Sequence, residues 1–281
     1  MKKANKYLAI LFCFLLAACS SAKSGARKGS TVVSPYDFGL SKAKSGVERY
    51  DVLLRTHQAA VTQGVDVSYR GIKTIELEIP PGAERIPLTR HNDFNGCTFV
   101  IKNVQKTVYL FEAKETSLPI SISKSSIDKG RFEEYPELSQ GKHLLLIEDA
   151  NPWVENRKGF SYGHQRKDIL LVEEGMARNA VVMPYDNKES APNCRYINAD
   201  NSDIDIKNLT ICRTENSSAI TNIFFISGKN GVLLSNFSLH TPENDGRNDR
   251  AIRIDDCTKC TVGKCDNRWY ILFPRTLRLW D

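Results

Sequence analysis

The chain has 281 residues, of which 41% are hydrophobic and 26% are charged, and its formal net charge is +6. Six of its 39 lysines and arginines lie before residue 30, where there is no acidic residue, so the remaining 33 basic residues balance the 33 acidic ones. The part of the chain after residue 30 therefore has no net charge. This argues against nucleic acid as a partner, because binding to nucleic acid needs a surplus of positive charge.

The N-terminal segment 1–18 is typical of an export signal. Three lysines precede a short apolar run, 7–18, that is too short to span a membrane. The run ends in Leu16-Ala-Ala-Cys19, which resembles the lipobox of bacterial lipoproteins. The lipobox predicts cleavage of residues 1–18 and a lipid on Cys19 that anchors the protein to a membrane of the bacterial cell envelope, on the periplasmic side or at the cell surface. An ordinary secretory signal cleaved nearby is the alternative.

A tether and one long helix are expected next. Residues 19–35 are rich in Ser, Ala, Gly and Lys and predict a flexible linker. Ser45 and Glu48 have the spacing of a capping box, apolar residues follow near helical spacing, and Gly64 is a suitable stop. We therefore expect an amphipathic helix over 46–63.

After this helix the period of the sequence becomes that of β-strands. Residues 74–79 alternate strictly between polar and apolar side chains, and Pro80-Pro81-Gly82 turns the chain. Further short β-rich runs lie at 98–101, 107–111, 120–123, 144–147, 169–172 and 180–183. These runs predict an essentially all-β body.

An internal repeat of constant length predicts how these strands are arranged. Residues 202–211 align with 230–239 and with 258–267. Segment 97–104 repeats the local pattern, with Phe99, Ile101 and Asn103 in the roles of Ile204, Ile206 and Asn208. A fixed period built from short alternating strands indicates a solenoid. We expect a parallel β-helix over 36–267.

The predicted helix, the strand and turn "TIELEIPPGAERI", and coils of the type "NGVLLSNFSL" resemble the pectate lyase and pectin lyase superfamily. With the lipobox, the chain resembles β-helix lipoproteins of polysaccharide-foraging bacteria of the Bacteroides kind. The resemblance implies a right-handed parallel β-helix with an N-terminal capping α-helix. It also implies a polysaccharide lyase or glycoside hydrolase, with Ca²⁺ as a cofactor if the protein is a lyase.

Residues 148–190 depart from the coil pattern and predict an inserted hairpin. Three aromatic residues of this stretch, Trp153, Phe160 and Tyr162, are candidates for a sugar-stacking platform, because aromatic faces bind the apolar face of a pyranose. The alternative is a small local core beneath a long loop.

The best candidates for chemistry lie near the end of the repeat. Asp245 and Asp249 precede the strand 251–255, on which Arg253 and Asp255 should both point outward. In superfamily lyases, acidic residues on one face hold Ca²⁺ and a basic residue abstracts the proton. The alternative is a solvated loop whose polar residues only make turns. Asn244-Asp245-Gly246 and Asp255-Asp256 only faintly resemble polygalacturonase motifs.

Cys257, Cys260 and Cys265 have the spacing of a metal site, but the chain offers no second ligand pair. The repeat places Cys260 in an inward column and Cys257 in a turn, and it leaves Cys265 outside any coil. We therefore predict no metal site there.

The repeat predicts an asparagine at residue 264, where the chain has a lysine. Residues 268–281 do not continue the repeat. Reading the possible codons one base later restores the repeat pattern, which suggests a frameshift that truncates a longer β-helix. A genuine short C-terminal cap is the alternative.

Two functions are compatible with this sequence. One is a carbohydrate-active enzyme, and the other is a non-catalytic surface lipoprotein that binds glycan or protein; an inactive truncated fragment is a variant of the second. Clustered carboxylates with a nearby Arg or Lys would favour the enzyme, and scattered carboxylates would favour binding.

Overall fold

The computed structural model describes residues 32–102, 108–154, 164–185, 190–214, 221–240, 250–265 and 270–272. The predicted signal peptide, Cys19 and most of the tail 268–281 lie outside these ranges. Within them, no helix is long and apolar enough to span a membrane.

The N-terminal region is built around the predicted helix. Helix α2 spans Gly46–Gln63, with Ser45 Oγ accepting a hydrogen bond from the Glu48 amide at 3.1 Å and Gly64 in the left-handed conformation at its end. The Glu48 carboxylate accepts a hydrogen bond from the Lys44 amide, so the capping box is only half formed. The bounds of the helix agree with the prediction because both end signals lie next to it in the sequence.

The end of the predicted tether 19–35 contains a strand. Strand β1, Val32–Val33, pairs in parallel with β2, Asp66–Val67. Two short 3-10 helices follow, η1 over Pro35–Phe38 and η2 over Leu40–Lys42. The prediction missed β1 because two valines are too short to form a pattern.

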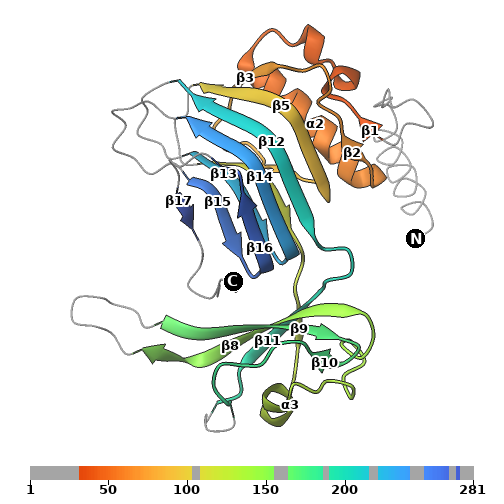
Figure 1. Ribbon diagram of the computed structural model, residues 1–281, viewed down its shortest axis with the longest axis vertical. Helices are drawn as coiled ribbons and strands as arrows, with labels where there is room; N and C mark the ends of the chain where they lie inside the picture. Colours follow the sequence, from red (N-terminus) through yellow and green to blue (C-terminus); the bar gives the residue numbers. More distant parts are fainter. Residues whose placement is uncertain are drawn as a thin grey trace, which may run out of the picture.

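The body consists of two five-stranded parallel sheets that lie face to face (Figure 1). The first sheet contains β3 (Thr74–Glu78), β5 (His91–Lys102), β12 (Ile204–Arg213), β14 (Asn230–His240) and β16 (Thr258–Gly263). The second contains β4 (Ile86–Pro87), β6 (Val108–Lys114), β13 (Thr221–Ser227), β15 (Arg250–Asp255) and β17 (Tyr270–Leu272). The chain alternates between the two sheets, and the all-β class is confirmed.

The register of these sheets follows the internal repeat. Ile204 pairs with Val232, and Val232 pairs with Cys260. Cys260 is half-buried against the core, as its column position predicts. Each strand therefore lies beside its counterpart one repeat away.

The alignment of 97–104 with this repeat was wrong. Phe99 pairs with Ile211, not with Ile204, and Asn92 pairs with Ile206. Between paired positions, β5 has three residues, 94–96, where β12 has only Asn208. The extra residues shift the register, so Asn95, with a φ of 51°, lies at the bend where Asn208 has a φ of 58°.

One hydrophobic core fills the space between the two sheets. The aromatic rings of Phe94, Phe99, Phe111, Phe224 and Phe237 are fully or almost fully buried in it. The Phe111 and Phe224 rings stack with their centroids 5.5 Å apart.

Helix α2 contributes to the same core. Its Leu53 and Ala60 side chains have no exposed surface. His57 is buried, and its two ring nitrogens lie 2.9 Å from the Pro87 carbonyl oxygen and 2.7 Å from the Tyr69 hydroxyl. His57 is therefore a satisfied structural residue.

The three C-terminal cysteines also belong to the body. Cys257 is in a turn, as predicted, but it is only 2% exposed. Cys265 packs against the core one repeat after the buried Phe237, so the prediction that it lies outside any coil was wrong. That prediction failed because Cys, as a small apolar residue, takes the place of the larger Leu209 and Phe237.

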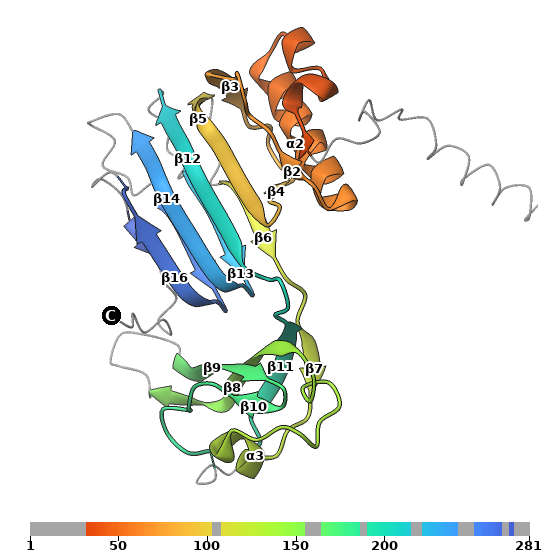
Figure 2. The ribbon, with the colours of Figure 1, turned by 45° about the vertical axis from the view of Figure 1, so that its right-hand side comes forward.

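The largest departure from the prediction is the size of the insertion. Between β6 and β12 the chain forms an antiparallel sheet, ordered β10-β9-β8-β11-β7, that lies beyond the ends of the body's strands (Figure 2). Its elements are β7 (Leu118–Ile120), α3 (Lys124–Lys129), β8 (Lys142–Val154), β9 (His164–Glu173), β10 (Met176–Ala177) and β11 (Asn193–Asn198).

The predicted hairpin 148–190 is thus only part of this sheet. The run 144–147 and Ile120 of the run 120–123 belong to it and not to the coils, whereas 121–123 are not in a strand. The predicted run 180–183 is not a strand. The insertion has its own core, which includes Phe132, Leu145, Leu170 and Tyr185.

Candidate functional site

A tightly held turn of the body presents Asp256 towards the insertion. Asp256 has a φ of 52° and lies between β15 and β16. The neighbouring Cys257 Sγ accepts a hydrogen bond from the Lys229 amide at 3.3 Å, and the Thr258 amide donates to the Lys229 carbonyl at 3.0 Å. Because Lys229 lies in the turn one repeat earlier, stacking of the two turns fixes the backbone at Asp256.

The insertion presents three charged side chains on the face that is turned towards Asp256. Glu148 of β8 pairs with Lys167 of β9 across the sheet, and their side chains form an ion pair at 3.4 Å. Arg195 of β11 pairs with Leu146, two residues before Glu148, so its side chain is on the same face.

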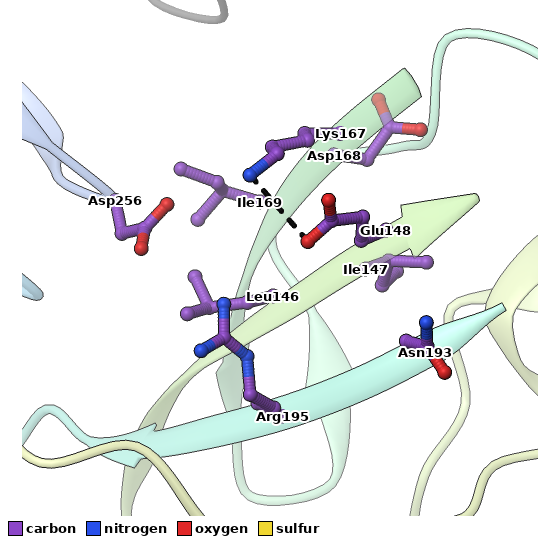
Figure 3. A pocket seen from close by; sticks show the side chains of 9 residues that line it. All are labelled: Leu146, Ile147, Glu148, Lys167, Asp168, Ile169, Asn193, Arg195 and Asp256. Atoms are coloured by element: carbon purple, nitrogen blue, oxygen red, sulfur yellow. Dashed lines mark ion pairs between the residues drawn. The ribbon is translucent and has the colours of Figure 1, made fainter. Parts of the chain in front are cut away.

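These residues surround a pocket between the insertion and the body (Figure 3). Figure 3 shows Lys167, Arg195 and Asp256 around one space, with Glu148 beside Lys167 and with Leu146 and Ile169 on its apolar side. The full lining consists of Leu146, Ile147, Glu148, Lys167, Asp168, Ile169, Asn193, Arg195 and Asp256. Besides Asp168, whose carboxylate is ion-paired with Arg166, two carboxylates and two cations from four segments of the chain therefore meet in one place.

The pocket changes the acidity of Asp256. Burial raises the pKa of its carboxyl group above the ordinary value, because a charged carboxylate loses contact with water. Lys167 and Arg195 oppose this rise in pKa, whereas the negative charges of Asp255 and Glu148 add to it. A carboxylic acid that keeps its proton to a higher pH is suited to general-acid catalysis.

The strand that leads to Asp256 carries two of the predicted site residues. Arg253 and Asp255 form an ion pair, with Arg253 Nη2 2.9 Å from the Asp255 carboxylate. The Arg253 guanidinium also lies 5.6 Å from the centre of the Phe225 ring, and its Nη1 lies 3.5 Å from the Tyr109 hydroxyl. The prediction that Arg253 and Asp255 share the outer face of this strand is therefore confirmed.

Around Arg253, aromatic and arginine side chains form a continuous outer surface on the second sheet. The Tyr109 and Phe225 rings are 5.4 Å apart, and the Arg85 guanidinium lies within 5.0 Å of both ring centres. Arg85 in turn forms an ion pair with Glu112. We call Arg85, Tyr109, Glu112, Phe225 and Arg253 the outer aromatic surface.

The other predicted site residues are not placed by the structure. Asp245, Asp249, Phe160 and Tyr162 lie outside the described residues, and of Trp153 only the backbone, in β8, is described. The predicted Ca²⁺ site and sugar-stacking platform therefore stay predictions.

The described residues do not supply the Ca²⁺ ligands on their own. In the described ranges no group of three or more His, Cys, Asp or Glu side chains could hold a metal ion. Asp255 is held by Arg253, and this ion pair competes with any cation for the carboxylate.

Sequence reasoning missed Glu148, Lys167, Arg195 and Asp256 as a group. The Asp255-Asp256 pair was noticed only as a faint echo of a polygalacturonase motif, and the other three lie on strands that were not recognised as one sheet. The one available signal was that Glu148 and Lys167 lie in a stretch that breaks the repeat.

Comparisons with known proteins leave the family open. No protein-family model matches the chain. No curated protein matches its sequence at a significant level.

Two solved structures match part of this chain, and both are tailspike proteins of bacteriophages. One is the Gp54 tailspike of Acinetobacter baumannii bacteriophage AP22, in complex with A. baumannii capsular saccharide, with 12% identity and a TM-score of 0.38. The other is the tailspike protein gp49 from Pseudomonas phage LKA1, with 14% identity and a TM-score of 0.44. Each match covers 83% of this chain but only 46% of the tailspike, so the chain spans less than half of either protein.

Proposed function

We propose that the chain is an envelope-anchored lipoprotein with a right-handed parallel β-helix, and that it cleaves polysaccharide at Asp256. The anchor is the lipid predicted on Cys19. The site is the pocket formed by Glu148, Lys167, Arg195 and Asp256.

The β-helix part of the proposal is supported by the alternation of the chain between two parallel sheets. Each repeat supplies one strand to each sheet, and the pairing partners lie one repeat apart in the last three repeats of the first sheet. Helix α2 acts as the N-terminal cap. Its Arg49 Nε donates to the Glu76 carbonyl at 2.6 Å and its Tyr50 hydroxyl donates to the Glu84 carbonyl, which ties it to the first repeat.

The observation that carries the catalytic proposal is the raised pKa of Asp256 in a pocket that holds a second carboxylate. Glycoside hydrolysis requires one acid that protonates the leaving oxygen and a second carboxylate that acts as base or nucleophile. Asp256 has the first role and Glu148, ion-paired with Lys167, has the second. Arg195 offers hydrogen-bond donors to the sugar.

The outer aromatic surface supports polysaccharide as the substrate class. It begins on the strand that ends at Asp255, next to Asp256, so a glycan chain that reaches Asp256 can continue along Arg253, Phe225 and Tyr109. Aromatic rings and arginine side chains provide stacking surfaces and hydrogen-bond donors for sugar rings.

A second candidate function is binding of glycan without cleavage. It is favoured by the outer aromatic surface, where Arg85 and Arg253 are each neutralised by a carboxylate and no acid stands free to act on a bond. In this case the pocket at Asp256 would contribute contacts but no chemistry.

The test is to incubate the purified chain with a panel of neutral and uronate polysaccharides, with and without Ca²⁺. New reducing ends without unsaturated sugars would support hydrolysis, whereas unsaturated ends would indicate a lyase. Asp256→Asn should slow product formation by a factor of roughly 10²–10⁴. Asp203→Asn, which removes a surface carboxylate paired with Arg90, is the matched control and should not. Binding without any product would transfer the assignment to the second candidate.

A further inference from the structure

The proposed site depends on how the insertion is seated on the body. Asp256 belongs to the body, whereas Glu148, Lys167 and Arg195 belong to the insertion. The insertion is joined to the body by the short segments 115–117 and 199–203. The relative position of the two carboxylates is therefore set by contacts between the insertion and the body's turns.

One of these contacts is at Gly228, in the turn between β13 and β14. Gly228 has a φ of 73°, and a Cβ added there would lie 2.8 Å from Ile197 Cδ1 and 3.1 Å from Glu115 Cβ. The 2.8 Å distance is shorter than Cβ atoms adopt in proteins, so a Cβ at residue 228 would force the Ile197 Cδ1 atom to move, and the 3.1 Å distance would require a smaller shift of Glu115. Ile197 is 3% exposed and lies on the same face of the insertion sheet as Leu144, which pairs with it.

Hydrogen bonds connect this contact directly to the turn at Asp256. The Gly228 amide donates to the Asp255 carbonyl at 3.1 Å, and the Glu115 amide donates to the Ser227 carbonyl at 3.1 Å. The next residue, Lys229, forms an ion pair with Glu115. One turn thus holds the start of the insertion, the Ile197 side chain and the backbone before Asp256.

We propose that Gly228 is a positioning residue, whose lack of a side chain lets Ile197 seat the insertion and so holds Glu148, Lys167 and Arg195 opposite Asp256. This role for Gly228 in catalysis rests on the proposed function, whereas the seating itself does not.

The test compares two glycine substitutions with the same backbone strain. Gly228→Ala and Gly96→Ala both place a Cβ at a φ of 73°, but the space around Gly96 is open to 4 Å. Hydrogen–deuterium exchange of the full chain should become at least tenfold faster in 195–198 for Gly228→Ala only. Exchange in β12 and β14 should stay slow in both variants, which shows that the body remains folded.

A second variant separates seating from general damage. Ile197→Val removes the Cδ1 atom that a Cβ at residue 228 would meet, so Gly228→Ala with Ile197→Val should recover slow exchange in 195–198. If Gly228→Ala alone does not fold, Ile197→Ala is the substitute, because it loosens the same contact with Gly228 intact.

The pKa of Asp256 is a second measurement, and it would not change if Gly228 had a merely structural role. Carboxyl-carbon NMR titration should find a lower pKa for Asp256 in Gly228→Ala than in Gly96→Ala, because loss of seating exposes the carboxyl group to water. Equal exchange and equal pKa in the two variants would overturn the proposal, as would failure of Ile197→Val to rescue. If seating behaves as expected but the unaltered chain cleaves no polysaccharide, the seating stands and the proposed function fails.

Discussion

Substitution of Lys264 by Asn should stabilise the protein, because the repeat requires an asparagine there. Asn208 and Asn236 occupy the bend of the two preceding repeats, with φ values of 58° and 51°, and Lys264 has a φ of 51°. Asn236 Nδ2 donates to Asn208 Oδ1 at 2.7 Å, and Asn208 Nδ2 donates to Asp93 Oδ1 at 2.9 Å. An asparagine at residue 264 would add one more step to this ladder.

Two contributions make up the expected gain in the free energy of unfolding. Asparagine tolerates the left-handed conformation, which costs most other residues roughly 1–2 kcal/mol. A side-chain hydrogen bond from residue 264 to Asn236 Oδ1 would add about 0.5–1 kcal/mol, at the lower end of the usual range because Asn236 is exposed. The sum is about 1.5–3 kcal/mol, which raises the melting temperature by roughly 2–4 °C per kcal/mol in a domain of this size.

Lys259→Asn is the matched control. Lys259 is also an exposed lysine with a φ of 51°, but it lies outside the asparagine ladder. Lys259→Asn should gain only the free energy that comes from tolerance of the left-handed conformation. Thermal and urea unfolding of both variants measure the difference, and a Lys264→Asn variant no more stable than Lys259→Asn would refute the assignment of Lys264 to a regular bend of the repeat.

Three further predictions concern ionisation and packing. Because the pKa of Asp256 is raised in the folded state, its contribution to stability is fully present below the unfolded pKa and is lost as the pH rises through the folded pKa. Asp256→Asn should therefore be more stable than the unaltered protein at neutral pH, and the difference should vanish in acid. Urea unfolding at several pH values would detect this. Burial lowers the pKa of His57 from 6.5 to about 4, so its contribution is present above the unfolded value and is lost as the pH falls between these two values. The loss of unfolding free energy is on the order of 3 kcal/mol and should be absent from His57→Asn but retained in His91→Gln. If the unfolding free energy changes equally with pH in these two variants and in the unaltered protein, the prediction is wrong. Leu234→Ala, at a position with no exposed surface between Ile206 and Val262, should cost about 2–5 kcal/mol in unfolding free energy, whereas Leu118→Ala, at a side chain that is 50% exposed, should cost far less.

The parts of the fold that were predicted correctly depend on signals that are local in the sequence. Helix α2 has Ser45 and Gly64 at its ends, and the last three repeats have equal length, so their register could be read from spacing alone. Where the spacing changes, as at residues 94–96, the same reasoning failed.

The insertion and the site could not be predicted in the same way. A short apolar run such as 144–147 has the same pattern in a parallel coil and in an antiparallel sheet, because only its partner strand differs. Glu148, Lys167, Arg195 and Asp256 come from four separate segments, and only the seating of one sheet against one turn brings them together. Arg253 and Asp255 could be placed on one face because they lie two residues apart on a single strand.

The rate at which the protein releases oligosaccharides, followed across pH, tests the central claim most directly. If Asp256 is the general acid, the maximum rate falls as the pH rises through the folded pKa of Asp256, and Asp256→Asn lowers the maximum rate by a factor of roughly 10²–10⁴. Asp203→Asn should keep the rate and the pH profile of the unaltered protein. An Asp256→Asn variant that cleaves polysaccharide at the normal rate would contradict the account.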